Sequence, residues 1–142
     1  MKQLIYFSCM VIALSLASCT ADKKDDPASP SPTTDDRDKF VGSWMCNETS
    51  QLSGSTSYPI GISKSTTNSS EIIINRFYDI LSQDVRASVS GNAITIPYQQ
   101  LGTVGFARGT GTLSTSGTNL SLAYTTTVSS NQDNCTASCA KQ

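Results

Sequence analysis

The side chains able to perform chemistry after residue 40 are few, and they lack the commonest catalytic base. The whole chain of 142 residues contains no histidine, which excludes Ser-His-Asp triads, Cys-His pairs and imidazole metal ligands. A glycosidase would need two carboxylates about 5–10 Å apart across a cleft. The acids instead lie singly near expected strand ends and loops, where we expect them to be solvated; they are Glu48, Glu71, Asp79, Asp84 and Asp133. We therefore expect no catalytic residue and a protein that is not an enzyme.

Metal and nucleic-acid sites find no better support. Asn131-Gln132-Asp133-Asn134 offers oxygen ligands for calcium, but one carboxylate in four residues is typical of a turn. From Phe40 onward, five basic residues balance the five acids, and the whole chain has a net charge of −1. With this balance, the sequence shows no excess of basic residues that would bind nucleic acid. We expect no metal, no cofactor and no nucleic-acid partner.

Arg108 is the charged residue whose position suggests contact with a ligand. By the period of two along a strand, it shares a face with Val104 and Phe106. If Phe106 points into a barrel, Arg108 does too, and a buried guanidinium needs a carboxylate or an anionic ligand as its partner. If the strand bends at its glycines, Arg108 instead reaches solvent or pairs with an internal acid such as Glu48.

Aromatic residues complete the candidate ligand-binding set. Tyr58, Tyr124 and Phe106 lie at inward-compatible positions, and they would line a pocket if the interior is open. Aromatic side chains in a small barrel more often form its packing. The candidate set is therefore these three aromatic residues with Trp44 and Arg108.

Three cysteines after residue 40 predict one disulfide in an oxidising envelope. Cys135 and Cys139 lie four apart on an expected strand, about 13 Å between Cα atoms, which is too far to bridge. Cys46 is therefore one partner. In a closed meander the first and last strands are antiparallel neighbours, and pairing Cys46 with Cys139 would push Gly42 beyond the C-terminus. We favour Cys46–Cys135 and keep Cys46–Cys139 as the alternative.

The elements that hold these residues are strands. Short apolar alternations separated by Ser, Thr, Gly and Asn begin at Phe40 and are typical of β-structure. Gly91-Asn92 predicts a tight turn, and Pro97 predicts a strand end. We expect eight strands, over 40–49, 58–62, 71–78, 85–89, 94–96, 104–113, 120–124 and 135–141.

Eight strands in about 100 residues, without a connection long enough for a crossover, indicate an antiparallel meander. An open meander would leave two unpaired edges, and closure removes them. We therefore predict an all-β domain over 40–142 that forms an eight-stranded up-and-down barrel, with a β-sandwich as the alternative.

Residues 1–18 have the pattern of a targeting segment. Lys2 supplies a positive charge, and the apolar run 4–16 is too short to span a bilayer as a permanent helix. Leu16-Ala17-Ser18-Cys19 then resembles the lipobox of bacterial lipoproteins. The resemblance implies that Cys19 is acylated, for example with palmitate, and anchors the chain in a membrane. The alternative is an ordinary cleavage site with Cys19 as a structural thiol.

Residues 19–39 predict a disordered linker, because they contain three prolines and no large apolar residue. Within it, Lys24-Asp25-Asp26 resembles the short acidic export signal that places lipoproteins of one group of Gram-negative bacteria on the outer face of the outer membrane. The resemblance implies surface exposure. As a plain solvated charge cluster, the segment would leave the domain facing the periplasm.

Phe40-Val41-Gly42-Ser43-Trp44 places a Gly-x-Trp motif at the head of the strand pattern. This motif resembles the lipocalin and lipocalin-like families, including small lipocalin-like surface lipoproteins of gut-type bacteria. The resemblance implies that Trp44 closes the bottom of a barrel. Lipocalins pack a basic residue near the last strand on this Trp, and Lys141 is the candidate. The short domain implies a small or filled interior.

Two function classes remain. A non-catalytic interaction or structural module would have a solid core, with exposed aromatic residues at tips such as 78–81 or 98–101, and a glycan or protein partner. A carrier of a small apolar or sugar ligand would need an internal cavity of about 300 Å³ or more. The short domain favours the first class.

Overall fold

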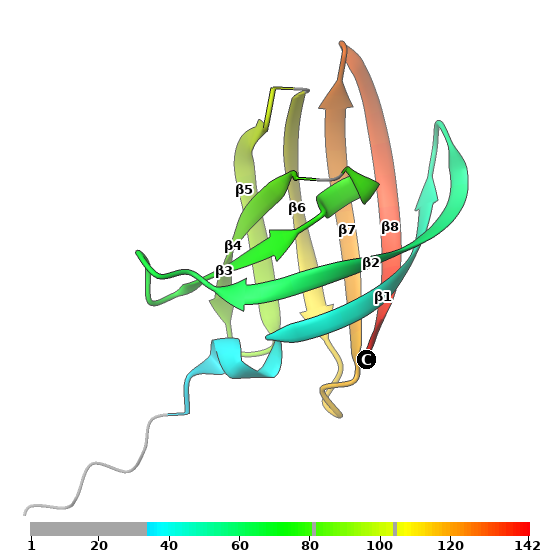
Figure 1. Ribbon diagram of the computed structural model, residues 1–142. Helices are drawn as coiled ribbons and strands as arrows, with labels where there is room; N and C mark the ends of the chain where they lie inside the picture. Colours follow the sequence, from blue (N-terminus) through cyan, green and yellow to red (C-terminus); the bar gives the residue numbers. More distant parts are fainter. Residues whose placement is uncertain (1–33, 81, 104) are drawn as a thin grey trace, which may run out of the picture. The chain divides into compact units, whose positions relative to one another are not determined.

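The computed structural model describes residues 34–80, 82–103 and 105–142. The expected signal segment, Cys19 and the Lys24–Asp26 cluster lie outside these residues. The described chain forms one closed antiparallel barrel, in which neighbouring strands follow the sequence order (Figure 1). The strands are β1 (Gly42–Ser50), β2 (Gly54–Lys64), β3 (Glu71–Asn75), β4 (Asp84–Ser90), β5 (Ala93–Leu101), β6 (Gly105–Leu113), β7 (Asn119–Val128) and β8 (Asn131–Lys141). The predicted all-β up-and-down barrel is confirmed, and the sandwich is not formed.

Each end of the barrel carries a short 3-10 helix. At the lower end, η1 (Asp36–Lys39) precedes β1; at the upper end, η2 (Phe77–Asp79) joins β3 to β4 (Figure 1). Among the described residues, no helix has the length and apolar character needed to cross a membrane.

Strand alternation directs the apolar side chains inward. In β1, for example, every second residue from Trp44 to Ser50 is buried, while the residues between them are exposed. Ile, Leu, Val and aromatic side chains from β1 to β7 share one core with the smaller Cys and Ala side chains of β8. The barrel is thus a packed body whose outer face carries the polar half of each strand.

The lower end is closed around Trp44, which is fully buried. Its indole Nε1 donates a hydrogen bond to the Phe40 carbonyl at 2.8 Å. Lys141 Nζ lies 5.2 Å from the Trp44 ring centroid and donates to the Lys39 carbonyl at 2.8 Å. The positions that the lipocalin resemblance implied for Trp44 and Lys141 are therefore occupied as expected.

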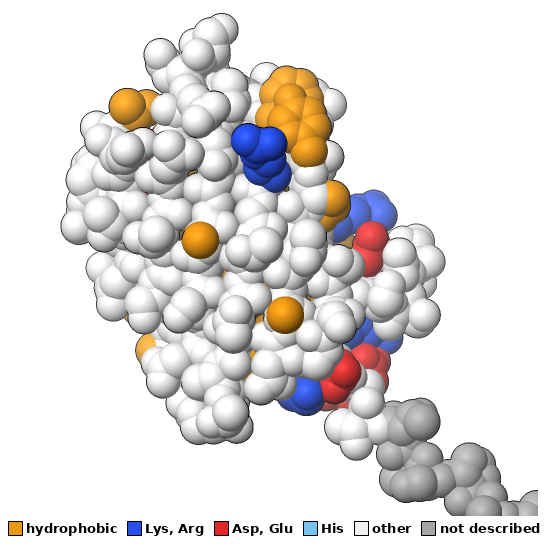
Figure 2. Space-filling view, turned by 180° about the vertical axis from the view of Figure 1, so that it is seen from behind, with side chains coloured by type: hydrophobic (Ala, Val, Ile, Leu, Met, Phe, Trp, Pro, Cys, Tyr) orange, Lys and Arg blue, Asp and Glu red, His pale blue; other side chains and the backbone are white. Residues whose placement is uncertain are grey.

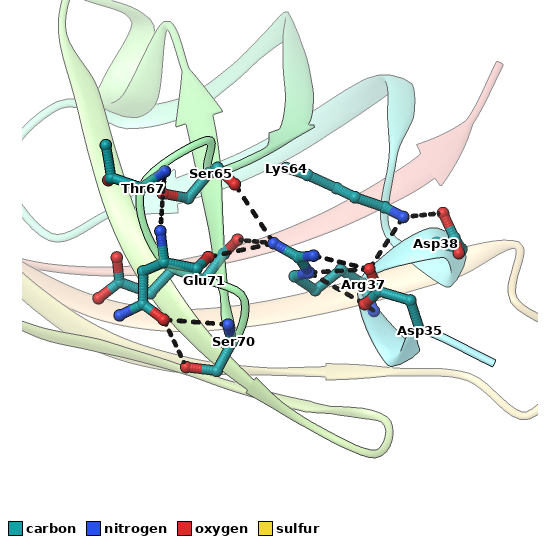
Figure 3. Close-up of polar contacts among 9 residues, drawn as sticks. Asp35, Arg37, Asp38, Lys64, Ser65, Thr67, Ser70 and Glu71 are labelled. Atoms are coloured by element: carbon teal, nitrogen blue, oxygen red, sulfur yellow. Dashed lines mark hydrogen bonds and ion pairs between the residues drawn. The ribbon is translucent and has the colours of Figure 1, made fainter. Parts of the chain in front are cut away.

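Residues 35–39, which the sequence assigned to the linker, contact the barrel. Asp35 caps η1 by accepting from the Arg37 amide at 3.0 Å. Arg37 also donates to the carbonyls of Ser65 and Asn68 in the segment between β2 and β3 (Figure 3). The last linker residues are thus tied to the barrel by contacts that a composition-based boundary does not register.

Five predicted strand boundaries are wrong. β2 begins at Gly54 rather than residue 58, and β7 continues to Val128 rather than residue 124. β3 ends at Asn75 rather than residue 78, because Arg76 takes a left-handed conformation with φ of 57°. β5 continues past Pro97 to Leu101, because a bulge accommodates the proline. β8 begins at Asn131, so the predicted turn at 131–134 is part of a strand.

The predicted disulfide is also wrong. Cys46 is bonded to Cys139, its direct register partner on β8, and Cys135 is a buried free thiol. The prediction assumed that all of the first strand pairs with the last. In the barrel the pairing of β1 with β8 starts at Trp44, and Gly42 pairs with Ile62 of β2 alone. The assumed register was off by four residues because strand ends in a closed barrel are staggered.

Candidate functional site

The outer face of β5 presents an exposed tyrosine because of a bulge. Ile96 pairs with Gly109 on β6, but the next pair joins Gln99 to Ala107, so β5 contains one extra residue. Pro97 cannot donate a ladder hydrogen bond, and such a residue fits a bulge. The extra residue leaves Pro97 and Tyr98 both pointing outward. Bulges of this kind re-aim side chains near functional sites.

A side-chain amide holds the bulge in place. Gln99 Nε2 donates to the Arg86 carbonyl at 2.7 Å, and its Oε1 accepts from the Arg86 amide at 2.9 Å. The ladder between β4 and β5 spans only residues 88–90 and 93–95, so the Gln99 amide replaces a missing backbone pair. Tyr98 therefore lies in a strand, next to Gln99, whose side chain is hydrogen-bonded to the backbone of β4.

Tyr98 stacks on Phe106 of β6, with ring centroids 5.1 Å apart and planes inclined by 9°. Both rings are exposed, at 67% and 41% of their surface. Arg108 lies two residues beyond Phe106 and also faces outward. We call Tyr98, Phe106 and Arg108 the aromatic–arginine patch. Figure 2 shows an apolar cluster with a basic side chain beside it near the upper part of this face.

Phe106 and Arg108 point outward, so the first of the two possibilities for Arg108 is not met and its side chain reaches solvent. The inward positions of β6 are held by small residues such as Gly109 and Gly111. A Cβ atom at Gly109 would collide with Tyr124, and one at Gly111 would lie 2.8 Å from Ile94 Cγ1. The neighbouring strands already fill this part of the core, so the large side chains of Phe106 and Arg108 face solvent.

Hollows in the outer face adjoin the patch. A shallow groove of about 610 Å³ is lined by Tyr98 and Arg108 together with side chains of β6, β7 and β8. A smaller hollow of about 160 Å³ lies between Phe106, Arg108 and the polar residues Thr125, Thr127 and Gln132. The aromatic–arginine patch thus borders two concave surfaces: the larger is mainly apolar with a few hydroxyl and amide groups, and the smaller is mainly polar.

Arg108 is the only charged side chain among the outward-facing residues of β6, β7 and of β8 from Asn131 to Ala140. It forms no ion pair or hydrogen bond with any described side chain. The rest of this face is formed by Thr, Ser, Asn, Gln and Ala, and it is almost uncoloured by charge in Figure 2. The guanidinium is therefore available to an anionic group.

Two of the acids expected to be solvated are instead inside the barrel. Glu48 is 5% exposed and accepts hydrogen bonds from the hydroxyls of Tyr58 and Tyr124. Burial, together with hydrogen bonding and the negative charge of Glu48, raises the pKa of both tyrosines well above their usual range. The two predicted ligand-binding tyrosines are therefore bound to an internal carboxylate.

Asp133 is the second internal acid and is 1% exposed. It accepts from Ser50 Oγ at 2.6 Å, from the Tyr78 hydroxyl at 2.7 Å and from the Leu52 amide at 3.2 Å. Burial acts to raise the pKa of Asp133, but these hydrogen bonds outweigh it and lower the pKa below its usual range. Burial and the charges of Glu48 and Asp133 raise the pKa of the Cys135 thiol to about 12, so this thiol is unreactive.

The period-two alternation of the first strand could have predicted that Glu48 is buried. Trp44, Cys46, Glu48 and Ser50 alternate on one face of the first strand, so an inward Trp44 implies an inward Glu48. Asp133 had a similar signal, two residues before the inward Cys135. The expectation of solvated acids overrode this pattern.

The five candidate ligand residues thus occupy three places: Trp44 in the lower end, Tyr58 and Tyr124 on the internal carboxylate, and Phe106 and Arg108 on the outer face. Tyr98 was noted only as a possible exposed tip and is the main addition to the site. Among the described residues, no three acidic or cysteine side chains are grouped so that they could hold a metal ion.

These features define a small eight-stranded antiparallel barrel, and solved structures share this fold. The structure of the redesigned β barrel b11L5F_LGL matches with a TM-score of 0.54 and 12% identity, covering 79% of this chain and 99% of that one. The structure of EF1p2_mFAP2b bound to DFHBI matches with a TM-score of 0.54 and 13% identity, covering 76% and 99%. At such identities the likeness shows the fold alone. No protein-family model and no curated protein matches the chain.

Proposed function

We propose that the chain is a lipid-anchored bacterial protein whose barrel is a non-catalytic interaction module at the cell surface. The observation that carries the proposal is the exposed stack of Tyr98 on Phe106, held outward by a bulge and flanked by Arg108. Exposed aromatic residues beside an unpaired cation are typical of recognition surfaces. The internal carboxylates support a non-catalytic role, because Glu48 and Asp133 are already occupied by tyrosine and serine hydroxyls.

The patch makes a direct prediction for the anchored protein. Tyr98 is 67% exposed, while Tyr58 and Tyr124 are 4% exposed, so a tyrosine-nitrating reagent should modify Tyr98 preferentially in the purified chain. If a partner covers the patch on intact host cells, nitration of Tyr98 there should fall severalfold. Equal nitration of Tyr98 on cells and in the purified chain would refute an occupied patch. Peptide mapping distinguishes Tyr98 from the half-buried Tyr78.

The anchor is tested by Cys19→Ala. Acyl chains contribute about 0.8 kcal/mol per buried CH₂, so two or three chains hold a protein in a membrane effectively permanently. The variant should leave the membrane fraction while its barrel stays folded by circular dichroism. Continued extraction by detergent alone would contradict the lipoprotein assignment.

Surface exposure is tested by deleting residues 24–26. Without the acidic cluster, the anchored domain should become resistant to protease added to whole cells. Unchanged digestion would show that the cluster is only part of the linker.

The carrier alternative keeps one supporting observation. Thr126 Oγ1 is fully buried at the upper end and has no hydrogen-bond partner among the described residues, which is unusual for an internal hydroxyl. A barrel of similar fold is described as bound to DFHBI. Native mass spectrometry of the chain purified from its host cells tests this alternative, because a retained small molecule would favour the carrier.

A further inference from the structure

We propose that the aromatic–arginine patch binds an acidic saccharide, a sugar chain that carries carboxylate groups. This inference rests on the proposed function and names the chemistry of the partner. Three features of the outer face carry it: a half-covered aromatic stack, one free guanidinium, and a lining of hydroxyl and amide side chains.

The aromatic stack offers one open ring face. Phe106 covers one side of Tyr98 in a nearly parallel arrangement, while 67% of the Tyr98 residue surface remains exposed. A pyranose ring has an apolar face of C–H groups that lies flat on such a ring, and the ring quadrupole favours these partly positive hydrogens. The bulge keeps Tyr98 in this position without a ligand, so little side-chain entropy is lost on binding.

The guanidinium of Arg108 selects for a negative charge. No acidic residue lines either of the two hollows beside it. A guanidinium presents a planar fork of donors that matches a carboxylate in two parallel hydrogen bonds. Because Arg108 is the only charge on this face from β6 to Ala140 of β8, the field of the face favours an anion over a cation.

The remaining lining matches sugar hydroxyls. Thr110, Thr125 and Asn134 line the groove of about 610 Å³, and Thr127 and Gln132 line the smaller hollow. Thr125 Oγ1 already donates to Asn134 Oδ1 at 3.0 Å, and Asn134 Nδ2 donates to Gln51 Oε1 at 2.8 Å. The hydroxyl and amide groups of Thr110, Thr127 and Gln132 can both donate to and accept from sugar hydroxyls. The groove is shallow and open to solvent, so it can hold a short stretch of a chain rather than a single enclosed molecule.

A protein partner fits less well. A stable protein interface buries about 800 Å² on each partner and has an apolar core. The large hydrophobic side chains exposed in the described residues are Val41, Met45, Leu52, Tyr98 and Phe106, and only the last two are stacked together. Two adjacent rings are enough for one or two sugar units but supply little of such a core.

The test compares one oligosaccharide with and without its charge. The full-length chain in detergent micelles is titrated by calorimetry with tetragalacturonate and with the same tetramer as its methyl ester, at low ionic strength. We expect the acid form to bind at least about tenfold more tightly, which corresponds to one charge-assisted hydrogen-bond pair. A parallel titration with sialyllactose and lactose separates uronic acids from sialic acids as the source of the carboxylate.

Three variants locate the binding. Arg108→Gln should lower the affinity for tetragalacturonate about tenfold and leave the methyl ester unchanged. Tyr98→Ala should weaken both forms. Arg86→Gln is the matched control, since Arg86 is exposed on β4 and only its backbone contacts Gln99; it should change neither affinity by more than about twofold.

The outcomes separate this inference from the proposed function. If the acid and ester bind equally, or if no saccharide binds at millimolar concentration, the acidic-saccharide assignment is wrong. Tighter binding of tetra-aspartate than of either acidic sugar would overturn it in favour of an acidic protein segment. Protection of Tyr98 from nitration on cells is measured independently, so the interaction module can survive each of these failures.

Discussion

The two ends of the barrel are closed by opposite means. At the lower end the charged groups lie at the surface: Asp35 pairs with Arg37 at 2.7 Å and with Lys64 at 2.9 Å (Figure 3), around a buried plug of Phe40 and Trp44. At the upper end Arg76 and Asp79 form an exposed ion pair at 2.7 Å, but two further acids, Glu48 and Asp133, lie inside the core. Water screens the exposed charges and not the two buried acids.

The backbone conformations of the two ends also differ: the lower one is regular and capped, and the upper one contains several left-handed residues. η1 is capped by the Asp35 side chain, whereas Arg76, Tyr78, Asp79 and Ser82 around η2 all have positive φ. Such conformations cost about 1–2 kcal/mol for residues other than glycine. The hydrogen bond from Tyr78 to Asp133 and the packing of Phe77 on Tyr124 at 4.5 Å offset this cost. The upper end therefore depends on its buried polar partners, and the lower end depends on its packing.

Removing the disulfide should lower the free energy of unfolding most, because this bond joins β1 to β8, the two strands whose pairing closes the barrel. The bond between Cys46 and Cys139 spans 93 residues, which corresponds to about 4–5 kcal/mol in the chain-entropy model. The double variant Cys46→Ala/Cys139→Ala should lose about that much free energy of unfolding in urea. Cys135→Ala, with no bond to lose, serves as the control and should lose clearly less.

Trp44→Ala should follow, at about 3–5 kcal/mol, because it removes a fully buried aromatic side chain from the lower end. The same urea experiment measures it. Trp44→Phe keeps most of the volume and should cost less than half as much. A loss below about 1 kcal/mol in Trp44→Ala would mean that packing does not hold the lower end.

Glu48→Ala should cost about 3 kcal/mol at the upper end, because it leaves the hydroxyls of Tyr58 and Tyr124 buried without their acceptor. Glu48→Gln keeps an acceptor oxygen and should recover part of the loss. Asp84→Asn, an exposed acid on β4, is the matched control and should be nearly neutral. Equal stability of all three variants would show that the internal carboxylate is dispensable.

Acid should weaken the upper end through Asp133. Its pKa is lowered in the folded chain from the ordinary value of 3.8, so the folded state binds this proton less readily than the unfolded state does. The stabilising contribution is complete above that value and is lost as the pH falls through the folded pKa. Unfolding in urea from pH 6 to pH 2 should therefore show a shallower acid slope for Asp133→Asn. An unchanged slope would contradict the prediction.

Lys64→Met should have the smallest effect. Lys64 bridges Asp35 and Asp38 at the exposed lower end, and exposed ion pairs contribute little. Its unfolding midpoint should stay within the scatter of repeated measurements, and 1 M salt should leave the difference from the parent chain unchanged. A clear destabilisation by Lys64→Met would show that the lower end, like the upper end, depends on its polar interactions.

Local patterns were sufficient for much of the fold. Period-two alternation predicted eight strands, and their short connections predicted a closed meander, because both depend on residues close together in the chain. The contact of Lys141 with Trp44 was also expected in advance, through the resemblance of the Gly-x-Trp motif to the lipocalin families. For Tyr98, the sequence suggested only that residues 98–101 form one of two possible exposed loop tips.

The remaining features were decided by contacts between distant strands. The pairing of Cys46 with Cys139 follows from the stagger of β1 against β8, which no single strand encodes. Phe106 and Arg108 face outward because Tyr124 and Ile94 leave room only for glycine at the inward positions 109 and 111 of β6. Glu48 and Asp133 are buried because tyrosine and serine hydroxyls from other strands satisfy them there. The sequence by itself determined which residues alternate on each strand; tertiary packing decided which of the two faces turns inward, since that choice depends on the volume and the hydrogen-bond partners that the other strands supply.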